Sequence, residues 1–186
     1  MTGVQTCALP ICLEAYQVAV LPVGSEAPGD TIYTYHTIDM KMQAHVSDIG
    51  WQDKENNGKI IGTTGKNKGI EAYSLSIQKE NLGITYTSCI NGKWQADVSD
   101  GQMSGTTGQA KHIEAIKIQL TGREKENYHV YYRVHVSNIG WLDWTADGAP
   151  AGTKHYKYPI EAIQVEVIPD DADNVPEMGK AYKEKK

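Results

Sequence analysis

The sequence has no phenylalanine, only three cysteines among 186 residues, and no apolar run near the roughly 18 residues that a membrane-spanning helix needs. Acidic residues also outnumber basic ones, with 23 Asp and Glu against 18 Lys and Arg, and basic residues cluster only at the very end of the chain. Phosphate binding requires a basic patch, so we expect no nucleic-acid partner. The cysteines Cys7, Cys12 and Cys89 cannot form a disulfide framework, and none lies at a metal-ligand spacing from a histidine.

Tyrosine, tryptophan and glycine are plentiful instead, with eleven, four and eighteen copies. Hydrophobic residues make up 40% of the chain and charged residues 22%, which fits one or two globular domains. Large side chains with a polar atom, combined with frequent turns, are typical of small all-β binding domains.

The N-terminal residues 1–12 are expected to be an artefact, because 1–11 back-translate to a common short-read sequencing adapter and Cys12 fits a hybrid codon. The remainder is then a truncated piece of a larger chain with other domains. Because Cys7 and Cys12 fall in this segment, Cys89 is the one cysteine left in the expected domain. A lone Cys in an apolar strand is expected to be a small buried residue rather than a reactive thiol.

A threefold internal repeat dominates the rest of the sequence. Without any gap downstream of Trp51, Trp94 and Trp141, glycine recurs 7 and 11 residues after each Trp, and Ile-Glu-Ala begins 19 residues after it. The second glycine of each copy is Gly62, Gly105 or Gly152, and the glutamate is Glu71, Glu114 or Glu161. Five positions that agree across three copies indicate repeated structure.

Proline-bearing polar stretches set the expected boundaries. We predict repeats at about 30–81, 82–122 and 123–169, which together form a domain over 30–169. Residues 13–21 match the end of a repeat and are expected to be the last strand of a preceding one, followed by a linker over 22–29. Residues 170–186 are expected to be a polar linker or tail.

Apolar residues alternate with polar ones in the long segments, as Ile116, Ile118 and Leu120 do with Lys117 and Gln119, and no segment sustains a helical period. The fold class is therefore all-β. About 45 residues cannot bury one sheet face alone, so the three copies are expected to close around a pseudo-three-fold axis as a β-prism-like domain. A β-trefoil-like arrangement is the alternative.

The repeated residues have structural roles in the prediction, with ligand binding as the weaker alternative. Trp51, Trp94 and Trp141 are expected to anchor the cores of their repeats. Each Ile-Glu-Ala glutamate shares the phase of inward residues, so unless a bulge intervenes its carboxylate points inward and needs partners. We expect those partners to be backbone N–H groups of the Gly-Thr-Thr-Gly turns.

Residues that break the repeat are the candidate ligand-binding residues. Trp144 stands where the other copies have Lys54 and Asp97, so the repeat does not need it and it is a candidate exposed stacking surface. Four residues of the same copy could add hydrogen bonds or aromatic contacts: Asp147, His155, Tyr156 and Tyr158.

No other motif predicts chemistry. His45 and His135 occupy equivalent strand positions without a nearby second ligand, so they are expected to be packing residues and no metal site is predicted. The Gly-Thr-Thr-Gly turns lack the Lys and helix of a phosphate loop, and no nucleophile elbow occurs. We expect no cofactor and no catalytic residue.

The pattern His-Val-x-x-x-Gly-Trp, followed by Asp-Gly, Gly-Thr-Thr-Gly and Ile-Glu-Ala-Ile-x-Ile, resembles the clostridial hydrophobic repeat with a conserved tryptophan, the ChW repeat. The resemblance covers residues 13–169. It implies a module of secreted or cell-surface proteins of Gram-positive anaerobes, with a role in adhesion or ligand binding. The expected partner is a polysaccharide or a cell-surface protein. The alternatives are a targeting module of a larger cell-wall or polysaccharide hydrolase, or a purely structural spacer.

Overall fold

The structure is a computed structural model that describes residues 38–172 and 174–185. The predicted artefact at 1–12, the strand at 13–21, the linker at 22–29 and the first residues of the domain lie outside the described residues. The description therefore begins just before the first long strand of the first repeat.

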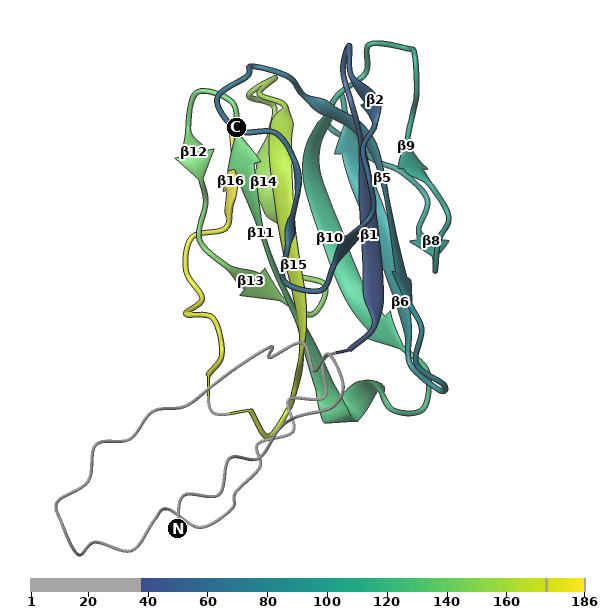
Figure 1. Ribbon diagram of the computed structural model, residues 1–186. Helices are drawn as coiled ribbons and strands as arrows, with labels where there is room; N and C mark the ends of the chain where they lie inside the picture. The colour runs from purple at the N-terminus through teal and green to yellow at the C-terminus, as the bar shows by residue number, and fades with distance from the viewer. Residues whose placement is uncertain (1–37, 173, 186) are drawn as a thin grey trace, which may run out of the picture. The chain divides into compact units, whose positions relative to one another are not determined.

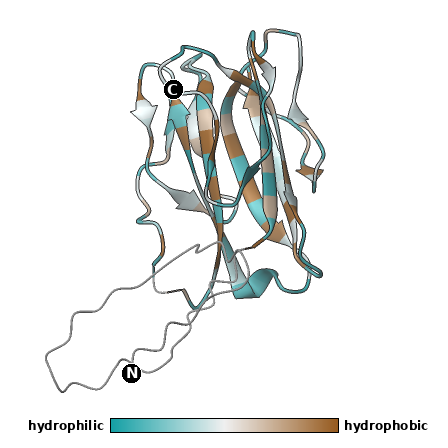
Figure 2. Ribbon diagram, viewed as in Figure 1, coloured by the Kyte–Doolittle hydropathy of each residue, from teal (hydrophilic) through white to brown (hydrophobic). Residues whose placement is uncertain are grey.

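Each repeat contributes one antiparallel pair of long strands, and these six strands are the frame of the domain (Figure 1). Their pairs are β1 (Met40–Val46) with β5 (Ile70–Ile77), β6 (Gly83–Ile90) with β10 (Ile113–Thr121), and β11 (Tyr128–Val136) with β15 (Ile160–Pro169). Figure 2 shows hydrophobic and hydrophilic residues alternating along these strands. One face of each pair is thus buried and the other is polar, as the period-two pattern predicts.

In the sequence, three short strands separate the two long strands of each pair, and they recur in the same order in each repeat. The first of each repeat, β2 (Gly50–Trp51), β7 (Lys93–Trp94) or β12 (Gly140–Trp141), carries the repeated tryptophan. The second is β3 (Glu55–Asn56), β8 (Val98–Ser99) or β13 (Thr145–Ala146). The third is β4 (Ile60–Gly62), β9 (Ser104–Gly105) or β14 (Ala151–Lys154). A single 3-10 turn, η1 (Lys125–Asn127), joins β10 to β11.

The third short strand of each repeat pairs with a neighbouring repeat rather than with its own. β9 pairs with β5, β14 pairs with β10, and β4 of the first repeat pairs with β15 of the last. The exchange is cyclic, so the three repeats form one closed unit. This confirms the all-β domain of three repeats closed around a pseudo-three-fold axis. The described strands form three separate sheets and no closed barrel, which fits the predicted prism-like arrangement and not the trefoil-like alternative.

We name the sheets by the repeat that supplies their long strands. The first sheet has the order β2-β1-β5-β9 with β3 against β1, and the third has β12-β11-β15-β4 with β13 against β11. The second has β16-β14-β10-β6-β7 with β8 against β6, where β16 (Tyr182–Glu184) comes from the C-terminal segment.

The repeated glycines Gly62, Gly105 and Gly152 allow the exchanged strands to approach their neighbours. Each has a positive φ, between 94° and 120°, and a Cβ on any of them would collide with the backbone carbonyl oxygen of the Ile-Glu-Ala glutamate in the neighbouring repeat. A side chain at these positions would force the paired strands apart. The recurrence of glycine 11 residues after each tryptophan is thus explained by strand exchange.

A single hydrophobic core lies between the three sheets. It is made of the inward residues of the long strands and includes three tyrosines that are almost entirely buried: Tyr73, Tyr86 and Tyr132. Their hydroxyl groups have partners, since the Tyr86 hydroxyl accepts from the Leu75 amide at 3.0 Å and that of Tyr132 accepts from the Ile118 amide at 3.1 Å. The tyrosines therefore fill the core and also hydrogen-bond strands of adjacent repeats.

The C-terminal segment, expected to be a polar linker or tail, packs on the domain over 174–185. β16 pairs in parallel with β14, the Gly152 amide donates to the Ala181 carbonyl oxygen at 2.8 Å, and Ala181 is buried in the core. The prediction missed this strand because three polar residues in a parallel edge pairing carry no alternating pattern.

Candidate functional site

The repeated tryptophans lie on the outer faces of the sheets. Trp51 is 42% exposed, Trp94 and Trp141 are half-buried, and none belongs to the hydrophobic core. The expectation that they anchor the cores is therefore wrong. The reason is register: Trp51 is opposite His45 and Trp141 is opposite His135, and directly paired residues share a sheet face. Both histidines point away from the core.

Each of these two tryptophans is held edge-on by the histidine that it faces. The ring centroids are 5.5 Å apart in both His45–Trp51 and His135–Trp141, with interplanar angles of 78° and 80°. The role expected of the histidines as packing residues is thus seen, although the packing is on the outer face. The contacts orient the indole rings without burying them.

The outer face of the third sheet carries a second tryptophan beside the repeated one. The guanidinium of Arg133, on β11, lies 4.7 Å from the ring centroid of Trp141 and 4.8 Å from that of Trp144. Its Nε donates to the Gln164 side-chain oxygen at 2.9 Å. We call Arg133, Trp141, Trp144 and Gln164 the aromatic face.

Cation–π contacts of this kind contribute about 0.5–1 kcal/mol each at exposed sites. They also fix the positions of the two indoles. In the second sheet, by comparison, Trp94 meets one cation, the Lys117 ammonium at 4.6 Å, and has no second indole among the described residues. The aromatic face is therefore a feature of the third repeat alone.

The Ile-Glu-Ala glutamates lie at β-bulges, which turn their side chains out of the inward phase. The pairing register skips one residue opposite His45/Val46, so that Ala72 and Ile70 are paired and Glu71 is not. Glu114 and Glu161 are skipped in the same way. The side chains remain buried, at 4–7% exposure. A buried carboxylate needs donors to offset its desolvation.

The groups that lie against these carboxylates are not the predicted turn amides. The carboxylate of Glu71 lies 3.3 Å from His45 Nδ1, and that of Glu161 lies 3.1 Å from His135 Nδ1. Glu114 accepts from the Gly92 amide at 3.1 Å. The turn amides bond instead to backbone: Thr106 donates to the Glu71 carbonyl oxygen at 2.9 Å, and Thr63 donates to that of Glu161 at 2.8 Å. The prediction had the right turns and residues but the wrong acceptor atom.

Comparison with known proteins identifies the repeat. The family model described as "Clostridial hydrophobic W" matches three segments, 45–79, 80–122 and 135–169, which together are more than half of the chain. The chain belongs to this family, ChW. The three matches confirm three ChW copies. No curated protein and no solved structure matches the chain significantly.

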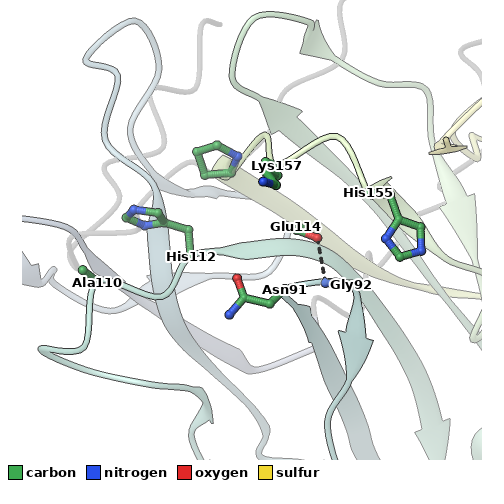
Figure 3. Close-up of a pocket in the computed structure, with 8 residues that line it drawn as sticks. Asn91, Gly92, Ala110, His112, Glu114, His155 and Lys157 are labelled. Atoms are coloured by element: carbon green, nitrogen blue, oxygen red, sulfur yellow. Dashed lines mark hydrogen bonds between the residues drawn. The ribbon is translucent and has the colours of Figure 1, made fainter.

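The third ChW repeat does not gather the five predicted ligand-binding residues in one place. Trp144 lies on the aromatic face of the third sheet. Asp147 is occupied by the domain itself, because its carboxylate accepts from the Val130 amide at 3.0 Å and contacts His129 Nδ1 at 2.6 Å. His155 follows β14 of the second sheet and lines a separate pocket (Figure 3).

Tyr156 and Tyr158 are also in the segment after β14. Their ring centroids are 5.9 Å apart, and Tyr158 packs partly against the core. They form a small aromatic pair in this ChW repeat, apart from Trp144 in the strand order. The prediction placed these residues together because they share a repeat, whereas strand exchange assigns them to different sheets.

Sequence reasoning missed Arg133 and the exposure of Trp141. Val130, Tyr132 and Val134 alternate inward on β11, so Arg133 shares the outward phase of His135, and that signal was present in the sequence. The face occupied by Trp141 depends on the reversal between β11 and β12, which alternation alone does not define. The contact of both indoles with one guanidinium was therefore not predicted.

Other site types find little support in this ChW domain. In the described part of the chain, no three His, Cys, Asp or Glu side chains are arranged to hold a metal ion, and no helix is long and apolar enough to cross a membrane. Cys89 is buried and free, and burial raises the pKa of its thiol to about 11. A protonated buried thiol is a poor nucleophile, as expected for a small buried residue.

Proposed function

We propose that this ChW domain is a noncatalytic binding module, secreted or displayed at a cell surface, that recognises polysaccharide through the aromatic face of the third sheet. Its ligands are cell-wall or other surface glycans. The observation that carries the proposal is the arrangement of Trp141 and Trp144 around Arg133, with Gln164 beside the guanidinium.

The chemistry of this face suits a sugar. Indole rings offer flat apolar surface for the C–H groups of a pyranose, and the guanidinium provides donors for its hydroxyl groups. The Gln164 side chain, which accepts from Arg133 Nε and donates to the Gly58 carbonyl oxygen, holds the guanidinium in place. The rings are held before any ligand arrives, by the T-shaped contact of His135 with Trp141 and by Arg133, whose guanidinium contacts both indoles. Pre-ordered side chains lower the entropic cost of binding.

The tryptophans on the other two sheets support a multivalent role. Trp51 and Trp94 occupy the same place on their sheets, so a long polymer could contact more than one outer face. A weak second contact forms at high effective concentration once the first is made. The same surface would suit a surface-protein ligand, and a module of this kind could target a hydrolase to its substrate. A purely structural spacer has no need of a tryptophan that is 42% exposed.

The experiment is a titration of the chain with soluble polysaccharides and cell-wall fragments, followed by intrinsic tryptophan fluorescence. We expect a saturable change for at least one glycan. In Trp144→Ala the affinity should fall about tenfold, in keeping with the loss of one stacking contact. Trp51→Ala is the matched control on another sheet and should retain most of the affinity.

Two results would count against the proposal. If the folded chain responds to no glycan, the ligand is not a polysaccharide, and a surface protein or a spacer role takes its place. If a glycan binds but Trp144→Ala and Trp51→Ala weaken it equally, the aromatic face of the third sheet is not the principal site.

A further inference from the structure

The second and third repeats depart from the repeat pattern at three positions, and two of these, the turn Asn91-Gly92 and His155, line one pocket (Figure 3). Cys89 stands where the other repeats have His45 and His135. The turn that follows is one residue shorter, Asn91-Gly92 in place of Ser-x-Ile. His155 stands where the first and second repeats have Gly65 and Gly108. Departures that are far apart in sequence and adjacent in space indicate a common cause.

The carboxylate of this pocket lacks the partner that its two counterparts have. In the first and third repeats the glutamate lies against a histidine ring nitrogen, at 3.3 and 3.1 Å. Glu114 has Cys89 in that place, and burial keeps the thiol protonated by raising its pKa to about 11. Within the described residues, Glu114 has one hydrogen bond, from the Gly92 amide at 3.1 Å, and no basic nitrogen within 4 Å.

Glu114 is nevertheless 93% buried, since only 7% of its surface is exposed, and it lines the pocket. An ionised carboxylate with a single backbone donor is poorly compensated for its loss of water. Figure 3 shows it between His155, Lys157 and Asn91. The carboxylate therefore has acceptor positions left open at the pocket.

His155 occupies its position against its backbone preference. Its φ is +65°, close to the +68° and +64° of the equivalent glycines Gly65 and Gly108. A side chain is disfavoured in this left-handed region, and such residues concentrate at functional sites. The ring has space because its neighbour Gly92 has no side chain, since a Cβ there would lie 2.8 Å from His155 Cε1. The pair thus places an imidazole over the pocket.

The pocket has the size and polarity of a small-molecule site. Its volume is about 450 Å³, and three more polar side chains line it, the Asn91 amide, the His112 imidazole and the exposed Lys157 ammonium. Small-molecule sites commonly range from about 300 to 1,000 Å³. One buried anion at the base and several donors around the rim suit a ligand with one cationic group and neutral or anionic oxygens.

We propose that this pocket binds a small ligand through a protonated primary amine that pairs with the Glu114 carboxylate, the one Ile-Glu-Ala glutamate that has no histidine beside it among the described residues. His155, Asn91 and Lys157 hold the oxygens of the ligand. An amino sugar and an amino acid share this chemistry, and either could come from a cell-wall polymer or from solution. The pocket and the aromatic face have no residue in common, so the two sites can be tested separately.

The first test is a titration of the full-length chain by two-dimensional amide NMR with four probes: glucosamine, N-acetylglucosamine, alanine and N-acetylalanine. We expect saturable shifts of the Gly92 and His155 amides with a free amine, and at least about tenfold weaker binding of its acetylated counterpart, since acetylation removes the charge-assisted hydrogen bond. Glucosamine alone would indicate an amino sugar, and alanine alone an amino acid. No shift with either amine, or equal binding of the acetylated forms, would overturn the proposal.

Variants provide the second test. Glu114→Gln should weaken the amine about tenfold, and Glu161→Gln, the matched change beside a histidine, should leave its affinity unchanged. Cys89→His restores the histidine beside the glutamate that the other repeats have, so it should compete with the amine for the Glu114 carboxylate and weaken binding at least about tenfold in a folded domain. A folded Cys89→His chain that binds the amine as tightly as the original would overturn the proposal, and this comparison remains decisive if Glu114→Gln fails to fold.

Discussion

At the residue scale, the repeated glycines divide into two kinds that the sequence does not distinguish. Gly105 has a φ of +112° and no space for a Cβ beside the Glu71 carbonyl oxygen, whereas Gly101 has a φ of +76° and nothing within 4 Å of a Cβ. Gly105 is required by the close approach of two repeats. Gly101 is required only by a turn, in which its amide donates to the Leu75 carbonyl oxygen at 2.7 Å.

Gly105→Ala should therefore cost much more stability than Gly101→Ala. We expect a loss of about 3 kcal/mol or more for the first, because the β9–β5 pairing must separate. The second should lose about 1 kcal/mol, the cost of a left-handed alanine. Chemical denaturation of both variants measures the difference, and equal losses would show that strand exchange does not depend on this glycine.

His129 predicts a pH dependence. It lies between two carboxylates, 2.6 Å from Asp147 and 2.9 Å from Asp170, and hydrogen bonds to both raise its pKa above 6.5. A raised pKa in the folded state means that the stabilisation is complete below the unfolded value of about 6.5 and is lost as the pH rises through the folded value. His129→Gln should thus be destabilising at about pH 5.5 and close to neutral at about pH 9.

NMR titration of the His129 ring gives the direct measurement for this prediction. We expect a midpoint above 6.5, and Asp147→Asn should lower it. A midpoint at or below 6.5 in the original chain would contradict the two-carboxylate contact. Because the ring is partly exposed, the effect on stability should shrink as salt is added.

At the element scale, the sequence predicted the long strands well and the bulges poorly. Alternation along β10 and β15 identifies their inward residues because one face is buried and the other is wet. A bulge inserts a single residue and leaves alternation on both sides intact, so nothing in the pattern of Ile-Glu-Ala shows that the glutamate is turned outward. The side of the sheet on which each tryptophan lies was unpredictable for a similar reason, since it depends on pairing across a reversal.

The C-terminal segment tests the role of a single edge strand. In a chain that ends at Asp171, the Gly152 amide loses the Ala181 carbonyl oxygen and β14 loses its outer neighbour. We expect the domain to stay folded, because β14 still pairs with β10, with a loss of about 2 kcal/mol from the missing hydrogen bonds and the exposed core.

Hydrogen exchange measures this effect locally. Exchange of the Gly152 amide should become much faster in the shortened chain, and the Gly105 amide, at the equivalent position in the first sheet, should be unaffected. Unchanged protection at Gly152 would mean that the segment does not form the strand in solution.

At the scale of the whole molecule, strand exchange makes the three repeats interdependent. β4 of the first repeat completes the third sheet, so no repeat has its own finished sheet. We expect one cooperative unfolding transition, seen at the same midpoint by circular dichroism and by tryptophan fluorescence. A chain of residues 82–186 lacks β4 and β5 and should not fold. Separate transitions, or a folded two-repeat chain, would indicate an open array of independent repeats.

The sequence also predicted the closed three-repeat domain, because 45 residues with alternating strands cannot bury a face alone. It could not predict the aromatic face or the Glu114 pocket as assembled sites. Both depend on which residues strand exchange and edge pairing bring together: Arg133 beside two indoles, and His155 over Gly92 of the preceding repeat. The departures from the repeat were visible as isolated positions, and their convergence was visible only in the structure.

The central claim, that the outer face of the third sheet binds a glycan, can be tested directly through the indole N–H signals of the four tryptophans. Each gives one resonance in an NMR spectrum, so addition of a bound polysaccharide reports on all four at once. We expect Trp141 and Trp144 to shift first and to saturate together, with smaller changes at Trp51 and Trp94. Shifts confined to Trp51 or Trp94, or none at all while the glycan is bound, would contradict it.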